Sequence, residues 1–122
     1  MDDFNISLNN YLENKFQQKK TRNLIRDLIN KTVESLKEFA SLDYLTIIPP
    51  NDDEKIYIEW VDYEKFYLGF EIDLKDLSFI QGYFRIWNDE DKWIDFIINR
   101  TTLEIPVKDI LRIWKIFNEG QD

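Results

Sequence analysis

The sequence contains no His and no Cys, and the residues whose spacing could support acid–base chemistry are carboxylates. Catalytic triads, thiol nucleophiles, disulfides and cysteine zinc sites are therefore excluded. Paired carboxylates on neighbouring strands could hydrolyse glycosidic or phosphodiester bonds, and the candidates at alternating strand positions are Glu59, Glu71, Asp73 and Asp95. Such a pair needs a cleft, which a 122-residue chain with three Gly has little loop material to build. We therefore expect a protein that is not an enzyme.

Two short acidic runs are the nearest approach to a metal site. Asp52-Asp53-Glu54 and Asp89-Glu90-Asp91 resemble the start of a calcium loop, but the later glycine and the closing glutamate are missing. The sequence also lacks a glycine-rich phosphate-binding loop. We expect no metal and no cofactor, and we interpret both runs as exposed acidic turns, the second joining two strands as a hairpin loop.

Aromatic residues interleaved with the carboxylates favour binding over catalysis. If the strand alternation holds, one face of a sheet carries the four carboxylates together with Tyr57, Tyr67, Tyr83 and Trp87. Tyr and Trp anchor protein interfaces because they bury a large area with few rotatable bonds. The alternative is that the N-terminal helices cover this face and the rings form a second layer of core. The pattern alone supports both interpretations equally.

Charge is distributed unevenly along the chain. Residues 1–40 contain six acids and seven bases, a net +1, whereas residues 41–122 contain eighteen acids and nine bases, a net −9, which together give the total of −8. The second part repels phosphate, so we expect no direct binding of nucleic acid. Carboxylates around aromatic anchors attract a basic protein and speed its association.

These features predict an acidic, non-catalytic protein-binding inhibitor. It would occlude a basic surface of a partner, for example the nucleic-acid groove of a nuclease, in the manner of an immunity protein, an antitoxin or a phage anti-defence protein. We assign partner contacts to the aromatic residues, the strand carboxylates and the acidic runs: Tyr57, Glu59, Tyr67, Glu71, Asp73, Tyr83, Trp87, Asp95, Asp52, Asp53, Glu54, Asp89, Glu90 and Asp91.

Two alternative functions remain open at this point. The first is a structural or assembly protein that self-associates through its N-terminal helices, with a homodimer through Leu24, Leu28 and Leu36 as one form. The second is a carboxylate enzyme, for which the sequence offers no motif.

Apolar spacing predicts the elements that must position these residues. Steps of three and four residues predict an amphipathic helix over residues 22–41, with a break near Lys20 and Thr21 as the N-cap. A weaker apolar stripe over residues 1–20 indicates either a helical arm or the first half of one long helix. Period-two alternation predicts four strands, Lys55–Asp62, Phe66–Leu74, Tyr83–Trp87 and Trp93–Ile98. Two further candidates are an edge strand over Tyr44–Ile48, before the Pro pair, and a short strand over Thr102–Ile105.

The order of elements predicts an α+β fold in a single domain over residues 1–122. It consists of an N-terminal helix or helix pair, an antiparallel sheet of four to five strands within residues 44–105, and a helix over residues 106–119 packed on the sheet. No apolar run reaches the ~20 residues of a membrane span, and the N-terminus lacks a signal-peptide pattern, so we expect a cytoplasmic protein. Frequent Ile, Asn and Lys with one Ala indicate AT-rich codons and a bacterial or phage source.

Overall fold

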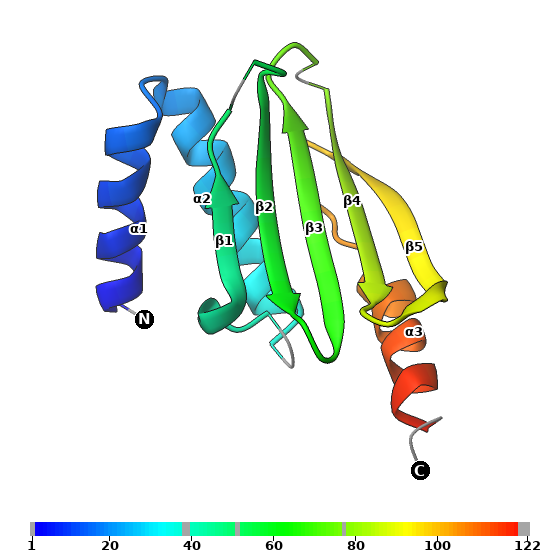
Figure 1. Ribbon diagram of the computed structural model, residues 1–122. Helices are drawn as coiled ribbons and strands as arrows, with labels where there is room; N and C mark the ends of the chain where they lie inside the picture. Colours follow the sequence, from blue (N-terminus) through cyan, green and yellow to red (C-terminus); the bar gives the residue numbers. More distant parts are fainter. Residues whose placement is uncertain (1, 38–39, 51, 77, 120–122) are drawn as a thin grey trace.

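The computed structural model describes residues 2–37, 40–50, 52–76 and 78–119. Three helices and five strands follow one another as α1 (Asp2–Lys15), α2 (Lys19–Ser35), β1 (Leu45–Ile48), β2 (Lys55–Asp62), β3 (Phe66–Asp73), β4 (Phe79–Ile86), β5 (Asp89–Asn99) and α3 (Val107–Glu119). A short 3-10 turn at Leu42–Tyr44 leads into β1. The strands pair with their sequence neighbours in the order β1-β2-β3-β4-β5, and every pair is antiparallel (Figure 1). The predicted α+β fold is confirmed.

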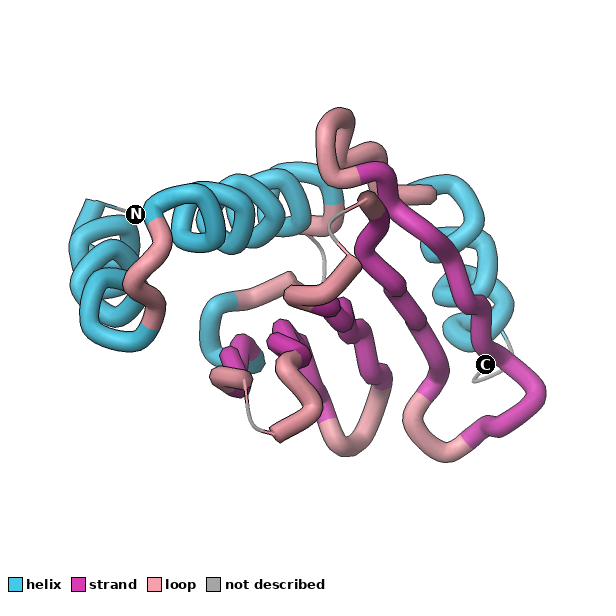
Figure 2. Tube along the Cα trace, turned by 90° about the horizontal axis from the view of Figure 1, so that it is seen from above, coloured by secondary structure: helices cyan, strands magenta, loops and turns pink. Residues whose placement is uncertain are grey.

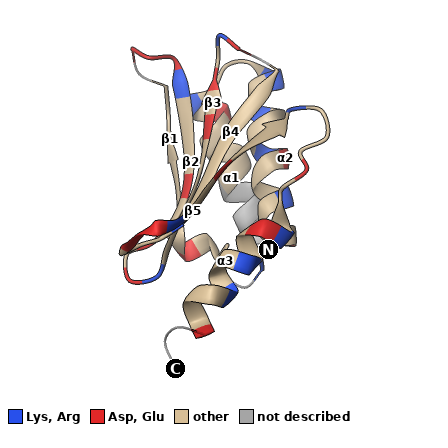
Figure 3. Ribbon diagram, turned by 90° about the vertical axis from the view of Figure 1, so that its right-hand side faces the viewer, with Lys and Arg blue, Asp and Glu red and all other residues tan. Residues whose placement is uncertain are grey.

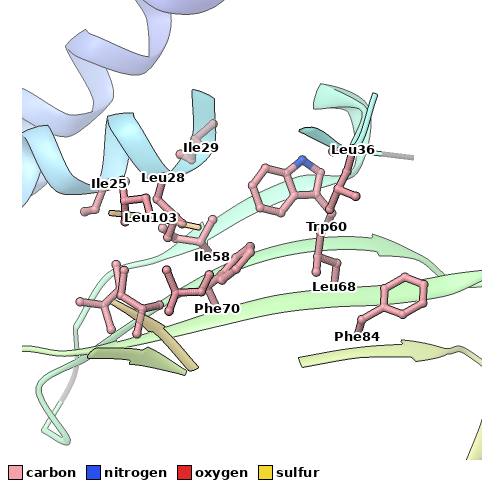
Figure 4. Packing of buried hydrophobic residues seen from close by; sticks show 14 of the residues in the cluster. Ile25, Leu28, Ile29, Leu36, Ile58, Trp60, Leu68, Phe70, Phe84 and Leu103 are labelled. Atoms are coloured by element: carbon pink, nitrogen blue, oxygen red, sulfur yellow. The ribbon is translucent and has the colours of Figure 1, made fainter. Parts of the chain in front are cut away.

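The hydrophobic core lies between one face of the sheet and the helices α2 and α3 (Figure 2). Alternation directs every second strand residue towards the helices, so that Ile58, Trp60 and Phe70 are completely buried. Ile25 and Leu28 of α2 pack above them, as Figure 4 shows. On α3, the ring of Trp114 meets Phe66 of β3 edge to face, with centroids 5.8 Å apart.

The two N-terminal helices are separate, and their bounds differ from the prediction. The break falls at residues 16–18, before Lys20, and Gln18 occupies the N-cap position predicted for Thr21. Arg22 Nη1 stabilises this turn by donating to the carbonyl oxygens of Phe16 (2.9 Å) and Gln17 (2.8 Å). An arginine hydrogen bond to the preceding turn is a tertiary feature that helix periodicity does not encode.

The second helix ends at Ser35, earlier than the predicted residue 41. Leu36 leaves helical geometry with φ −125° and ψ 50°, and its side chain is buried in the core. The apolar side chain of Leu36 therefore fills the core from outside the helix. Phe39, expected on the same helix, lies outside the described residues.

Helix α1 packs on the body of the protein and does not project as an arm. Its Leu8 and Leu12 are buried, and the hydroxyl of Tyr11 donates to the carbonyl oxygen of Ile47 in β1 at 3.2 Å. Of the three residues suggested for a homodimer, Leu28 and Leu36 are buried within the chain itself, and Leu24 is partly buried against the same core.

The strand ends also differ from the sequence prediction. β4 begins at Phe79, four residues before Tyr83, and β5 begins at Asp89. The hairpin turn is therefore Trp87-Asn88, and the predicted acidic loop at residues 89–91 is instead the start of β5. A shift of register between Arg85 and Ile86 makes room for these residues as a bulge.

The short strand predicted at Thr102–Ile105 does not form. The backbone turns after β5, with the N–H of Leu103 donating to the carbonyl oxygen of Asn99 at 2.9 Å. Leu103 has a positive φ of 51°, a left-handed conformation that a strand does not contain. This turn redirects the chain into α3.

Candidate protein-binding face

The face of the sheet opposite α2 and α3 carries most of the predicted site residues. None of the described helices lies across it (Figures 1 and 2). Cross-strand pairing places side chains of four strands next to one another there, as in the row Glu59, Gly69, Tyr83 and Asp95. We call this surface the open face, and its members on β2 to β5 include Tyr57, Glu59, Val61, Tyr67, Glu71, Asp73, Gln81, Tyr83, Arg85, Trp93, Asp95 and Ile97.

Two tyrosine rings occupy the centre of the open face. The rings of Tyr67 and Tyr83 stack with centroids 5.3 Å apart and an interplanar angle of 4°. Gly69 lies beneath them, and a Cβ there would come within 2.7 Å of Tyr83 and 2.9 Å of Tyr67. Gly69 is thus required for both rings to lie flat against the backbone of the sheet.

Hydrogen bonds hold the tyrosine hydroxyls in place. Tyr67 donates to Glu59 Oε1, and the hydroxyl oxygens of Tyr67 and Tyr83 are 3.3 Å apart. Burial raises the pKa of Tyr67, as does its hydrogen bond to Glu59, and burial also raises the pKa of Tyr83. Partial burial and the hydrogen bond to Asp53 raise the pKa of Tyr57 to about 12. All three phenols are therefore neutral hydrogen-bond donors at physiological pH.

Trp87 lies at one end of the open face, in the turn between β4 and β5. Its ring contacts Tyr63 edge to face at 5.0 Å and lies tilted against Tyr67 at 6.4 Å. The guanidinium carbon of Arg85 is 5.4 Å from the Trp87 ring centroid, within the range of a cation–π contact. Trp87 thereby extends the tyrosine cluster to the end of the sheet.

The two acidic runs are not brought together. Residues 52–54 precede β2 at one end of the sheet and residues 89–91 begin β5 at the other end, so the tyrosines lie between two acidic zones (Figure 3). Internal partners neutralise part of the charge of the two runs, with Lys75 4.0 Å from Glu54 and Lys92 3.4 Å from Asp89. Within the described part of the chain, no group of three potential ligands is placed to hold a metal ion.

Two exposed apolar residues of the open face were assigned no role from the sequence. Trp93 is 51% exposed and Ile97 is 70% exposed, and both flank Asp95 on β5. The period-two pattern places both residues on the same face as Asp95, and this pattern is the sequence signal that could have assigned them to the site. A shallow hollow of about 410 Å³ adjoins them, lined by Tyr83, Phe84, Arg85, Glu90, Trp93 and Asp95.

Comparisons with protein-family models, with curated proteins and with solved structures found no match to this chain. Among the helices of the described residues, none is both long enough and apolar enough to cross a membrane. On the open face, aromatic rings alternate with carboxylates, and the described helices leave this surface uncovered.

Proposed function

We propose that this protein is an acidic, non-catalytic binding protein that occludes a basic surface of a partner protein. The observation that carries the proposal is the open face, where Tyr67 and Tyr83 are stacked and hydrogen-bonded among carboxylates with no described helix above them. A surface that served only to contact water would gain nothing from rings held in one orientation. Rings fixed before binding lose little entropy on association and so favour a protein interface.

The charge of the open face indicates which sign of charge the partner surface would carry. Four of its carboxylates, on Glu59, Glu71, Asp73 and Asp95, accompany two cations, Lys55 and Arg85. Both cations are engaged within the protein, Lys55 with Glu71 and Arg85 with the Trp87 ring. A Lys- and Arg-rich surface is therefore attracted, and such steering raises association rates by roughly 10- to 1,000-fold at low salt.

The dimensions of the open face suit a macromolecule. The three central strands have eight residues each, and strands rise about 3.3 Å per residue and lie about 4.8 Å apart, so the five-stranded sheet measures roughly 26 Å by 19 Å. The resulting ~500 Å², extended by the flanking turns, approaches the ~800 Å² that each partner contributes to a standard interface. If the partner binds nucleic acid, the carboxylates occupy the positions that phosphates otherwise take.

Affinity capture from a lysate of the native organism, at low and at high salt, tests this proposal. The informative variant is Glu71→Lys/Asp95→Lys on the open face, and its matched control is Glu13→Lys/Glu34→Lys, which makes the same charge change at exposed positions of the helices. We expect a basic protein to be retained by the wild type and the control at low salt, and to be lost from the open-face variant.

Inhibition is then measured with the captured protein in purified form. Its binding to nucleic acid, or its enzymatic activity, should fall as the acidic protein is added and should recover with the open-face variant. Equal capture by the open-face variant and the control, or a captured partner with no excess of Lys and Arg, would refute the proposal.

A further inference from the structure

The two edges of the sheet differ in how they are protected. At the β1 edge, α1 lies alongside the strand and Tyr11 donates to the carbonyl oxygen of Ile47. At the other edge, β5 is the last strand of the sheet and, at eleven residues, the longest, and no described segment pairs with its outer side. Figure 3 views the molecule from this side, and the β5 edge faces the viewer.

The hydrogen-bond pattern between β4 and β5 determines which N–H and C=O groups of β5 point away from the sheet. Arg100 N–H donates to the carbonyl oxygen of Ser78 at 3.3 Å, and that pair continues the register between β4 and β5. Because hydrogen-bonded and non-bonded pairs alternate in an antiparallel ladder, the even-numbered residues from Ile94 to Ile98 bond to β4. Trp93, Asp95 and Ile97 therefore direct their N–H and C=O groups away from the sheet. The carbonyl oxygen of Asn99, another odd-numbered residue, likewise bonds outside the ladder, to the N–H of Leu103.

We propose that the β5 edge receives an extended segment of the basic partner as an additional strand. This inference rests on the proposed function, since the segment belongs to the same partner. The three outward-facing residues have their side chains on the open face, so an added strand continues that face. Main-chain hydrogen bonds then supply affinity, and side chains at alternate positions supply specificity.

The side chains of β5 define the sequence that this strand would carry. Trp93 and Ile97 are exposed apolar side chains, and Asp95 lies between them. Directly opposed residues prefer apolar against apolar and basic against acidic, so the partner segment reads apolar–x–basic–x–apolar. The pattern is the same in either chain direction. Asp95 and Glu90 also line the neighbouring hollow, together with Arg85.

A second copy of this chain fits the edge poorly. The antiparallel register that pairs all three outward-facing residues with a second β5 sets Trp93 against Ile97 and Asp95 against Asp95. Two carboxylates directly opposite each other destabilise strand pairing. The charge of β5 therefore favours a basic segment from another protein.

A synthetic peptide tests this inference directly on the full chain. The probe is an eleven-residue peptide, equal to β5 in length, with Val-Thr-Lys-Thr-Val at its centre, and its control has Glu in place of Lys. We expect the Lys peptide to slow amide hydrogen exchange at Trp93, Asp95 and Ile97. We also expect it to bind roughly tenfold more tightly than the Glu peptide, with the difference shrinking as salt is added.

A pair of substitutions at residue 97 separates main-chain pairing from side-chain contact. Ile97→Pro removes one outward N–H without removing a bond to β4, whereas Ile97→Thr keeps that N–H and similarly reduces the apolar contact. We expect the Pro variant to bind the Lys peptide at least about tenfold more weakly than the Thr variant. If the Pro variant fails to fold, the exchange pattern of the wild type decides.

The results that overturn the inference are distinct from those that overturn the proposed function. Protection at other amides, equal binding of the two peptides, or a self-associated dimer lost in Ile97→Pro would refute the edge site. Capture of a basic partner through the open face without peptide binding would refute the edge site alone. Peptide binding at β5 with no basic partner captured would refute the proposed function and would leave β5 as an edge that accepts a basic strand.

Discussion

The hydrogen bond between Tyr67 and Glu59 determines how rigid the open face is before it meets a partner. Tyr67→Phe keeps the ring and removes only the hydroxyl that donates to Glu59 Oε1. A hydrogen bond to a charged group contributes about 1.5–3 kcal/mol when buried. Both side chains here are half-buried, so we expect Tyr67→Phe to lower the free energy of unfolding by about 1 kcal/mol.

Tyr83→Phe is the matched control, because it removes the neighbouring hydroxyl from the same stacked pair. The Tyr83 hydroxyl is 3.3 Å from that of Tyr67, a weaker contact between two neutral groups. We expect it to contribute less than about 0.5 kcal/mol. The two variants therefore differ in the hydrogen bond to the Glu59 carboxylate and not in the packing of the rings.

Thermal unfolding followed by circular dichroism measures both variants. A loss of about 1 kcal/mol corresponds to a decrease of about 4 °C in Tm for a domain of this size, so Tyr67→Phe and Tyr83→Phe should be resolved. A double-mutant cycle with Glu59→Ala should return a coupling of about 1 kcal/mol between Tyr67 and Glu59. Equal Tm values for Tyr67→Phe and the wild type, or a greater loss in Tyr83→Phe, would refute the reasoning.

Three further predictions concern the core, the titration of the phenols and the exposed edge. Gly82→Ala should destabilise the protein by about 1–3 kcal/mol in denaturant unfolding, because its Cβ would lie 2.2 Å from the Phe96 ring; a neutral effect would show that Phe96 moves freely. Folding raises the pKa of Tyr67 and raises that of Tyr57 to about 12, so the stability linked to these protons is complete below the ordinary pKa of 10 and is lost as pH rises through the folded values. In a spectrophotometric titration, tyrosinate absorbance should therefore rise at a higher pH than that of free tyrosine. An unshifted titration would contradict the structure. Trp93→Ser should change the free energy of unfolding by no more than about 0.5 kcal/mol, because this indole is 51% exposed; a larger loss would place Trp93 in the core.

The fold class and most of the strands could be predicted from residue periodicity. β2 has the predicted bounds of Lys55–Asp62, and β3 differs by one residue at its end. These strands are half-buried, so burial imposes a clear alternation on the sequence. Prediction failed where a tertiary contact replaced the local signal, as at Leu36, which leaves α2 to fill the core.

Local alternation determined which side chains share a face, and for this reason the sequence alone groups Tyr57, Tyr67 and Asp95 correctly. It could not determine which face the helices cover, because aromatic rings occur on both faces of the sheet and either set could pack beneath a helix. Only the tertiary structure decided this, by packing α2 and α3 on Ile58, Trp60 and their neighbours. The physical reason is that helix packing depends on the joint fit of side chains from elements far apart in the chain. The same holds for the edge: the sequence contains β5, but only the arrangement of the sheet leaves its outer side open among the described residues.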